Sequence, residues 1–236
     1  MNKFHEIYLA GKQNRWYWLF YVFCRMVLAF AFVMAGMVKI LGERFASGLS
    51  VLHPMGAYLE ALHHTGYYYT FVGYAQVIAA VLLLIPRTVV LGALIYFPII
   101  LNIWVLSFAV RFDGSFVTSP LMVLANLFIL VWHYDKIRFL LPFKQVPDLP
   151  ALPSSIVYSN KFPLVFFGSV FLTVVATVLF FLFGLEVMPR NTLEDCQEQF
   201  VHTAKEKVGF DFCACIHEQG HSLEACLEEF GRHKAE

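Results

Sequence analysis

The sequence predicts an all-α membrane protein: a four-helix transmembrane bundle, a fifth transmembrane helix and a small disulfide-stapled helical domain outside the membrane. Two observations carry this prediction. Five apolar runs each approach the roughly 20 residues that cross a bilayer as a helix, and four of the five cysteines lie after residue 185. Charged residues make up 14% of the chain, against about 25% in soluble domains, which agrees with a membrane protein. The runs are 17–41, 67–84, 89–110, 117–132 and 162–185.

The lysines and arginines of the short connections predict the orientation, because short loops that are rich in these residues stay on the cytoplasmic side of the membrane. With the N-terminus inside, the cytoplasmic segments carry Lys3, Lys12, Arg15, Arg87, Lys136, Arg138, Lys144 and Lys161. The opposite segments carry Arg44, Arg111 and Arg190. Five crossings then place the C-terminal tail in an oxidising periplasm, and the expected location is a bacterial inner membrane.

The connections divide the chain into five parts. Residues 1–15 are expected to form a cytoplasmic arm, 16–141 the bundle, 142–161 a proline-rich cytoplasmic linker, 162–185 the fifth span and 186–236 the tail domain. The outer loop 42–66 has apolar residues at helical spacing between positions 55 and 64, which favours a short helix. Only Pro86, Arg87 and Thr88 separate the second and third spans, so these two should form an antiparallel hairpin.

Polar residues inside the predicted spans are the candidate site residues. Arg25 lies about a third of the way into the first span, where an arginine costs about 2.5 kcal/mol or more and needs compensation. Lys39 follows on nearly the same face, ~21 Å further along the helix. We expect inward-facing partners on the next three spans: Gln76, Asn102 and Asn126. Two interpretations remain open, a polar pocket for a quinone or small anion above Arg25, or mutual hydrogen bonds that hold the helices together.

Histidines of the outer loop are a weaker candidate for a proton relay or metal site. His53, His63 and His64 lie there, and Glu60 precedes His63 by three residues, which allows a His/Glu pair. Two adjacent histidines do not face each other on a helix. Solvated or headgroup-facing side chains are the simpler expectation.

The tail cysteines predict two disulfides, because a domain of this size cannot be held by its core alone. Cys196, Cys213, Cys215 and Cys226 allow three pairings, and a strained bridge between Cys213 and Cys215 is disfavoured. Two alternatives stay open: a zinc site formed by these two cysteines with His217 and His221, and a redox-active thiol pair. No metal is expected, since the cysteine spacing differs from that of usual zinc sites.

Several short segments resemble the DoxX family of small bacterial membrane proteins over about residues 16–140. They are Arg25 with Gly36 and Lys39 in the first span, residues 82–88, residues 92–94 leading into 98–102, and residues 121–136. The resemblance implies a four-helix membrane bundle and a redox neighbourhood, similar to the membrane subunit of thiosulfate:quinone oxidoreductases or to thiol-linked systems. Many relatives carry an acidic residue in the second span where this chain has Gln76. The fifth span and the cysteine-containing tail lie outside the family pattern.

Two functional hypotheses follow from these observations. The first is a non-catalytic membrane partner or scaffold of a larger complex, whose outer tail docks other membrane or periplasmic proteins. The second is a redox accessory subunit that binds quinone, the candidate cofactor, or a small anion near Arg25. Zero net charge argues against nucleic acid as a partner. The partner that the five apolar runs directly imply is the lipid bilayer. The residues do not decide whether the chain has catalytic activity.

Overall fold

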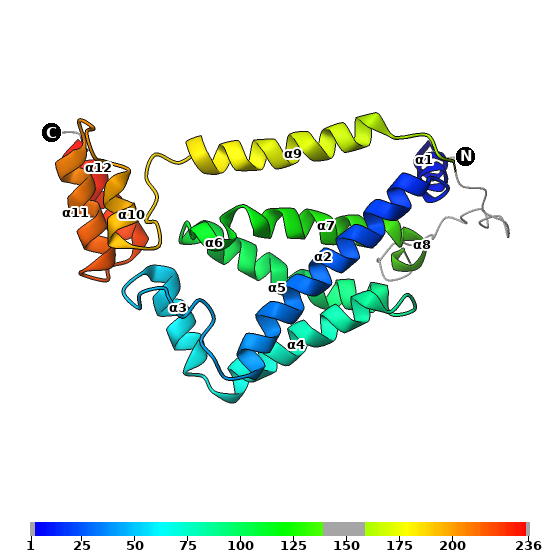
Figure 1. The fold of residues 1–236 in the computed structure, drawn as a ribbon, viewed down its shortest axis with the longest axis horizontal. Coiled ribbons are helices and arrows are strands. Elements are labelled where there is room, and N and C mark those ends of the chain that lie inside the picture. The colour runs from blue at the N-terminus through cyan, green and yellow to red at the C-terminus, as the bar shows by residue number, and fades with distance from the viewer. Residues whose placement is uncertain (1–2, 139–158, 235–236) are drawn as a thin grey trace.

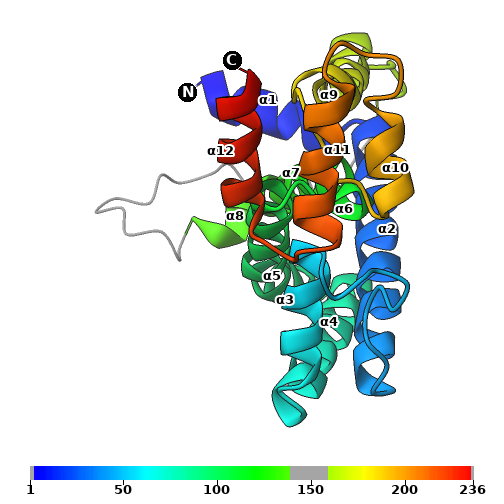
Figure 2. The ribbon, with the colours of Figure 1, turned by 90° about the vertical axis from the view of Figure 1, so that its left-hand side faces the viewer.

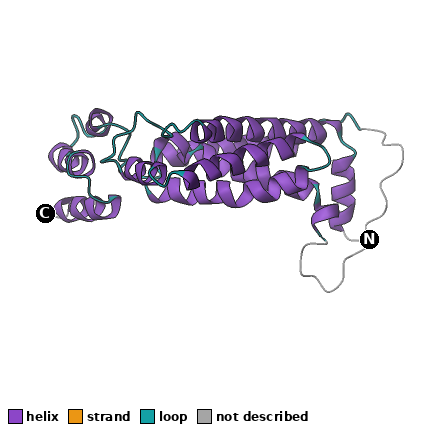
Figure 3. Cartoon of the chain, turned by 90° about the horizontal axis from the view of Figure 1, so that it is seen from below, coloured by secondary structure: helices purple, strands orange, loops and turns teal. Residues whose placement is uncertain are grey.

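The computed structural model describes residues 3–138 and 159–234, and it is helical with no strand in these two ranges. Figure 3 shows the helices and their connections. Five helical segments are long and apolar enough to cross a membrane: Arg15–Ile40, Tyr67–Leu84, Val89–Ala109, Asp113–Trp132 and Leu164–Phe183. The predicted fold class is therefore confirmed. Most of the proline-rich linker, residues 142–158, falls outside the described residues.

Four of these segments form the bundle. It consists of α2 (Arg15–Ile40), α4 (Tyr67–Leu84), α5 (Val89–Ala109) and α7 (Thr118–Trp132), with the short α6 (Asp113–Phe116) leading into α7. Figure 1 shows α2 crossing the other helices obliquely. The buried core lies between them and includes Leu28, Phe32, Leu83 and Tyr96.

The crossing of α2 and α4 depends on two glycines. A Cβ atom on Gly36 would lie 2.7 Å from the carbonyl oxygen of Gly73, and one on Gly73 would lie 2.8 Å from that of Gly36. Small residues let two membrane helices approach to backbone contact. This close approach brings Lys39 and Gln76, which neighbour these glycines, into the same interface.

The N-terminal arm contains a helix that was not specifically predicted from the sequence. Helix α1 (Lys3–Lys12) packs beside α8 (Tyr134–Ile137), where the Tyr8 hydroxyl donates to Asp135 Oδ1 at 2.8 Å and Lys12 Nζ lies 3.9 Å from the same carboxylate. Asn14 then begins α2, because its side chain accepts a hydrogen bond from the Trp16 amide in the usual N-cap manner. We call the end of the molecule formed by α1, α8 and the start of α2 the N-terminal end.

The fifth span, α9 (Leu164–Phe183), lies along the bundle without entering its core (Figure 1), and no residue of this helix is buried. Its start is tied to the start of α2, since the Asn14 side chain donates to the Lys161 carbonyl at 2.8 Å. The chain then forms the tail domain from three helices: α10 (Leu193–Glu198), α11 (Glu206–His217) and α12 (Leu223–Lys234). Figure 2 views this domain from its own side of the molecule.

The loop between α2 and α4 contains the predicted short helix, α3 (Pro54–His63), at the end of the bundle where the tail domain lies. His53 is its N-cap and Pro54 its first residue, a position that suits proline because the first helical amide has no partner. This end is called the tail-side end below.

Candidate functional site

Arg25 is engaged by the backbone of a neighbouring helix. Its Nε and Nη2 donate to the carbonyl oxygens of Leu83 and Leu84, both at 2.8 Å, and its guanidinium lies 5.2 Å from the Tyr21 ring centre. The last carbonyls of a helix have no partner within it, and α4 ends at Leu84. Arg25 therefore caps the C-terminus of α4.

Lys39 lies near the opposite end of α2 and is 7% exposed. Its Nζ donates to the Ala35 carbonyl at 2.9 Å and lies 4.5 Å and 5.9 Å from the ring centres of Phe45 and Tyr69. Within residues 3–138 and 159–234, no carboxylate forms an ion pair with it. Two aromatic faces thus compensate this buried cation.

The three amide candidates differ in placement. Asn126 is buried and its Nδ2 donates to the Ala93 carbonyl of α5 at 3.1 Å, while Gln76 is buried in the interface of α2 and α4. The oxygens Asn126 Oδ1 and Gln76 Oε1 are both buried without a hydrogen-bond partner. Asn102 does not face inward as expected, because its side chain is exposed on α5.

The structure does not gather these candidates into one pocket. Arg25 contacts the end of α4, Asn126 contacts α5, and Lys39 lies at the tail-side end. A cavity of about 410 Å³ is present between α2, α7 and α9, and none of the five candidates lines it. The hydrogen bonds of Arg25 and Asn126 each join two helices, which is the arrangement expected of groups that hold helices together, whereas Lys39 bonds a carbonyl of its own helix.

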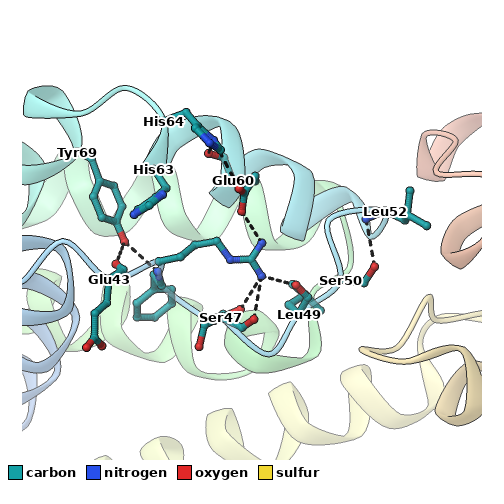
Figure 4. A network of polar contacts seen from close by, with 12 residues as sticks. Glu43, Ser47, Leu49, Ser50, Leu52, Glu60, His63, His64 and Tyr69 are labelled. Atoms are coloured by element: carbon teal, nitrogen blue, oxygen red, sulfur yellow. Dashed lines mark hydrogen bonds and ion pairs between the residues drawn. The ribbon is translucent and has the colours of Figure 1, made fainter.

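A second polar cluster folds the loop between α2 and α4 (Figure 4 shows Ser47, Leu49, Glu60 and Tyr69 of it), and its centre is Arg44. The guanidinium donates to Glu60 Oε2 at 2.9 Å and to the carbonyls of Ala46, Ser47 and Leu49. Glu60 also lies 3.5 Å from His64 Nδ1, so the acid pairs with His64 rather than His63.

Tyr69 closes the other side of this loop. Its hydroxyl donates to the Glu43 carbonyl at 2.7 Å and accepts from the Phe45 amide at 2.8 Å. His63 bonds the Gly42 carbonyl through Nε2 at 3.0 Å. Because each of these groups holds loop backbone in place, the cluster stabilises the loop and positions α3.

The tail domain is held against the tail-side end of the bundle by a junction of polar contacts. Arg111 Nη1 donates to the Val187 carbonyl at 2.6 Å, and Arg190 Nη1 lies 3.5 Å from Asp113 Oδ2. Val187 is 2% exposed. Arg111, just before α6, and Asp113, the first residue of α6, thus fix the first residues of the tail.

His53 and His217 meet in the same junction. His53 is fully buried, its Nδ1 accepts from the Met55 amide at 3.1 Å, and its ring centre lies 5.7 Å from that of His217. His217 Nε2 bonds the Pro189 carbonyl at 2.7 Å. Burial, and secondarily the neighbouring His217, lowers the pKa of His53 from 6.5 to about 4, while the backbone of Arg190 acts in the opposite direction. The neutral form of His53 is therefore the one that fits the docked tail.

The tail domain contains two disulfides, as predicted, joining Cys196 to Cys213 and Cys215 to Cys226. Neighbouring Cys213 and Cys215 do not pair with each other, which also agrees with the sequence. Around the disulfides the aromatic rings of Phe200, Phe212 and Phe230 pack at centre distances of 5.8 to 6.5 Å.

The zinc alternative does not fit this arrangement. Its two cysteines are oxidised and therefore offer no thiolate, and His217 is bonded to backbone. In the parts of the chain that the structure describes, no three His, Cys, Asp or Glu side chains are grouped as metal ligands.

Arg44, Arg111 and Arg190 have structural roles that were not predicted from the sequence, where they bore only on the orientation. Each binds a loop carbonyl or an acid at the tail-side end. Their partners depend on the folded positions of the loop and the tail, so the sequence offered no direct signal for these roles.

Comparison with known proteins gives one informative relative. The chain is 34% identical over 128 residues to the uncharacterized protein YwoB of Bacillus subtilis (strain 168), a match that covers 52% of this chain and 81% of that protein. No family model matches the chain, and no solved structure matches it significantly.

Proposed function

The chain belongs to the same family as YwoB of Bacillus subtilis, and we propose that it is a DoxX-like, non-catalytic membrane subunit that scaffolds a larger complex. In this proposal the five spans anchor the chain and the tail domain docks a partner outside the membrane. The observation that carries the proposal is the junction that fixes the tail to the bundle through Arg111, Asp113 and His53. A tail fixed in this way presents its docking surface at a defined position relative to the bundle.

The contacts of the intramembrane polar residues support a structural role. Both hydrogen bonds of Arg25 go to carbonyls of α4, and Asn126 bonds the backbone of α5. The redox alternative, in which quinone or a small anion binds near Arg25, would need that guanidinium to be available. Two of its five N–H donors are instead engaged by the backbone at the end of α4, which favours the structural role.

The proposed location is a bacterial inner membrane with the N-terminus in the cytoplasm and the tail in the periplasm. The excess of basic residues at the N-terminal end supports this orientation, and so does the presence of two disulfides in the tail, because disulfides persist in oxidising compartments. A C-terminal tag should be digested by a protease added to spheroplasts. A fully protected tag would contradict the orientation.

The chemistry of the tail indicates a basic partner. From residue 186 onward the sequence contains eleven acidic and five basic residues, although the whole chain has zero net charge. Glu224 and Glu229 are exposed on α12, and further exposed acids lie on the other two tail helices. Complementary charge gives association its specificity and speed. We therefore expect a periplasmic protein, or the outer part of a membrane protein, with a positively charged face.

The test is purification of the tagged chain after mild detergent extraction. We expect a partner in fixed stoichiometry that is lost at high salt and lost in the double variant Glu224→Lys, Glu229→Lys. The control is Glu6→Lys, a charge reversal at an exposed position of α1 at the opposite end of the molecule, and it should retain the partner. A monomeric chain with no retained neighbour would contradict the scaffold function.

A further inference from the structure

A cavity of about 410 Å³ separates the middle of α9 from the bundle. Its walls are residues 20–28 of α2, 121–128 of α7 and 166–174 of α9. All three segments lie within membrane-spanning helices, so the cavity opens into lipid hydrocarbon and not into water.

Two clusters of aromatic rings attach α9 on either side of this cavity. In each cluster one or more rings of α9 contact rings of the bundle, with centre distances between 5.0 and 6.4 Å. The cluster at the N-terminal end consists of Phe20, Phe128 and Phe166, and the tail-side cluster consists of Phe108, Phe116 and Phe180. The helix is thus held near both ends and stands away from α2 and α7 between them.

Both hydroxyl donors in the lining of the cavity are already engaged by backbone carbonyls. The only two hydroxyls in it belong to Ser169 and Thr173, and they donate to the carbonyls of Phe166 at 2.7 Å and of Ser169 at 2.8 Å. The other lining residues are apolar apart from the Cys24 thiol. A buried water needs two to four polar partners, so neither water nor a polar ligand suits this site.

The volume distinguishes between apolar occupants. A segment of helix about 12 Å long and 10 Å wide, enough to cover the same stretch of α2, takes roughly 1,000 Å³, which excludes a helix of a partner. If a methylene group fills about the volume of a water molecule in the liquid, ~30 Å³, the cavity takes roughly 14 carbon atoms. This is the size of one hydrocarbon chain.

We propose that the cavity between α2, α7 and α9 binds one acyl chain of a membrane phospholipid. The chain enters sideways from the bilayer, fills the space between the two aromatic clusters and replaces the missing helix-to-helix contacts of α9. The phospholipid is then a structural component that co-purifies with the protein. This inference does not depend on the scaffold function.

The test is native mass spectrometry of the full chain purified in mild detergent, followed by lipid extraction. We expect about one phospholipid per chain to survive washing. In Val170→Trp the indole fills the cavity, because Val170 lines it, and the bound phospholipid should fall at least fivefold. The control is Val165→Trp on the same helix, where Val165 is 88% exposed and outside the cavity, and it should retain the lipid.

A second variant from another helix protects the test against misfolding. Ala125→Phe fills the same cavity from α7 and should also displace the lipid, while size-exclusion profiles and circular dichroism report folding. Wild-type protein that retains no lipid, or filled variants that are folded and retain as much lipid as the control, would overturn the proposal. Recovery of an isoprenoid quinone in place of a phospholipid would also overturn it and would favour the redox alternative.

Discussion

The burial of His53 predicts that the protein loses stability as the pH falls below neutrality. Its pKa is about 4 in the folded chain and about 6.5 when exposed, so between these values the unfolded chain binds more protons. The stabilisation is fully present above about pH 6.5, declines as the pH falls toward 4 and is lost below it. At 1.36 kcal/mol per pKa unit, the difference corresponds to roughly 3 kcal/mol.

The assay is urea unfolding of the detergent-solubilised protein, followed by circular dichroism, at several pH values between about 7 and 4. The reference variant is His53→Asn, because asparagine keeps an N-cap acceptor for the Met55 amide but does not titrate. Burial also lowers the pKa of His133 to about 4, yet this contribution is present in both proteins and cancels in their difference.

The expected result is that the unfolding free energy of the wild type, relative to His53→Asn, falls by roughly 3 kcal/mol over this range. His217 and Arg190 face His53 and remain in both proteins, so the comparison isolates the effect of His53. A difference that is constant with pH would refute the inference that His53 is neutral in the junction.

Three further predictions concern the helix contacts and the tail, and each is measured by thermal or urea unfolding in detergent. Arg25→Ala should lower the unfolding free energy by about 2–4 kcal/mol, since two charged hydrogen bonds to carbonyls are lost, and Arg25→Lys by about half as much; equal losses would contradict the cap. Gly73→Leu should cost about 3 kcal/mol or more because its Cβ would lie 2.8 Å from the Gly36 carbonyl. Gly168→Leu, with no atom within 4 Å of its Cβ, should not lower stability, because glycine inside a helix is itself unfavourable by up to about 1 kcal/mol; similar losses at both glycines would refute the close crossing. Cys226→Ser should destabilise the tail by about 2–4 kcal/mol and leave the melting of the bundle unchanged. Limited proteolysis reports unfolding of the tail separately from unfolding of the spans.

The fold was largely predictable because membrane insertion imposes a simple rule on the sequence. A span must be long, apolar and helical, and the predicted bounds of the five spans agree with the structure to within a few residues. The hairpin of α4 and α5 and the short helix α3 followed from loop length and apolar spacing. Helix α1 was missed, because a short polar segment outside the membrane has no comparable constraint.

The candidate site was less predictable, because the partner of an intramembrane polar group depends on how helices rotate about their axes. Arg25 was recognised as costly, but its contact with the end of α4 requires the crossing geometry of α2. Asn102 was placed inward, yet the rotation of α5 turns it outward and buries Ser107 and Tyr96 instead. Periodicity alone cannot decide this on a helix such as α5 that is apolar on nearly every side.

The attachment of the tail does not depend on how α9 packs in the membrane. The contacts that dock the tail come from Arg111 and Asp113, at the connection between α5 and α6, and from His53 in the loop before α3. Helix α9 contributes none of these groups, and its own attachment includes the two aromatic clusters and the hydrogen bond from Asn14 to the Lys161 carbonyl at its start. Loss of a bound acyl chain would therefore loosen α9 without releasing the tail, whereas protonation of His53 would weaken the junction without emptying the cavity. The two effects are physically separate, so failure of one proposal leaves the other standing.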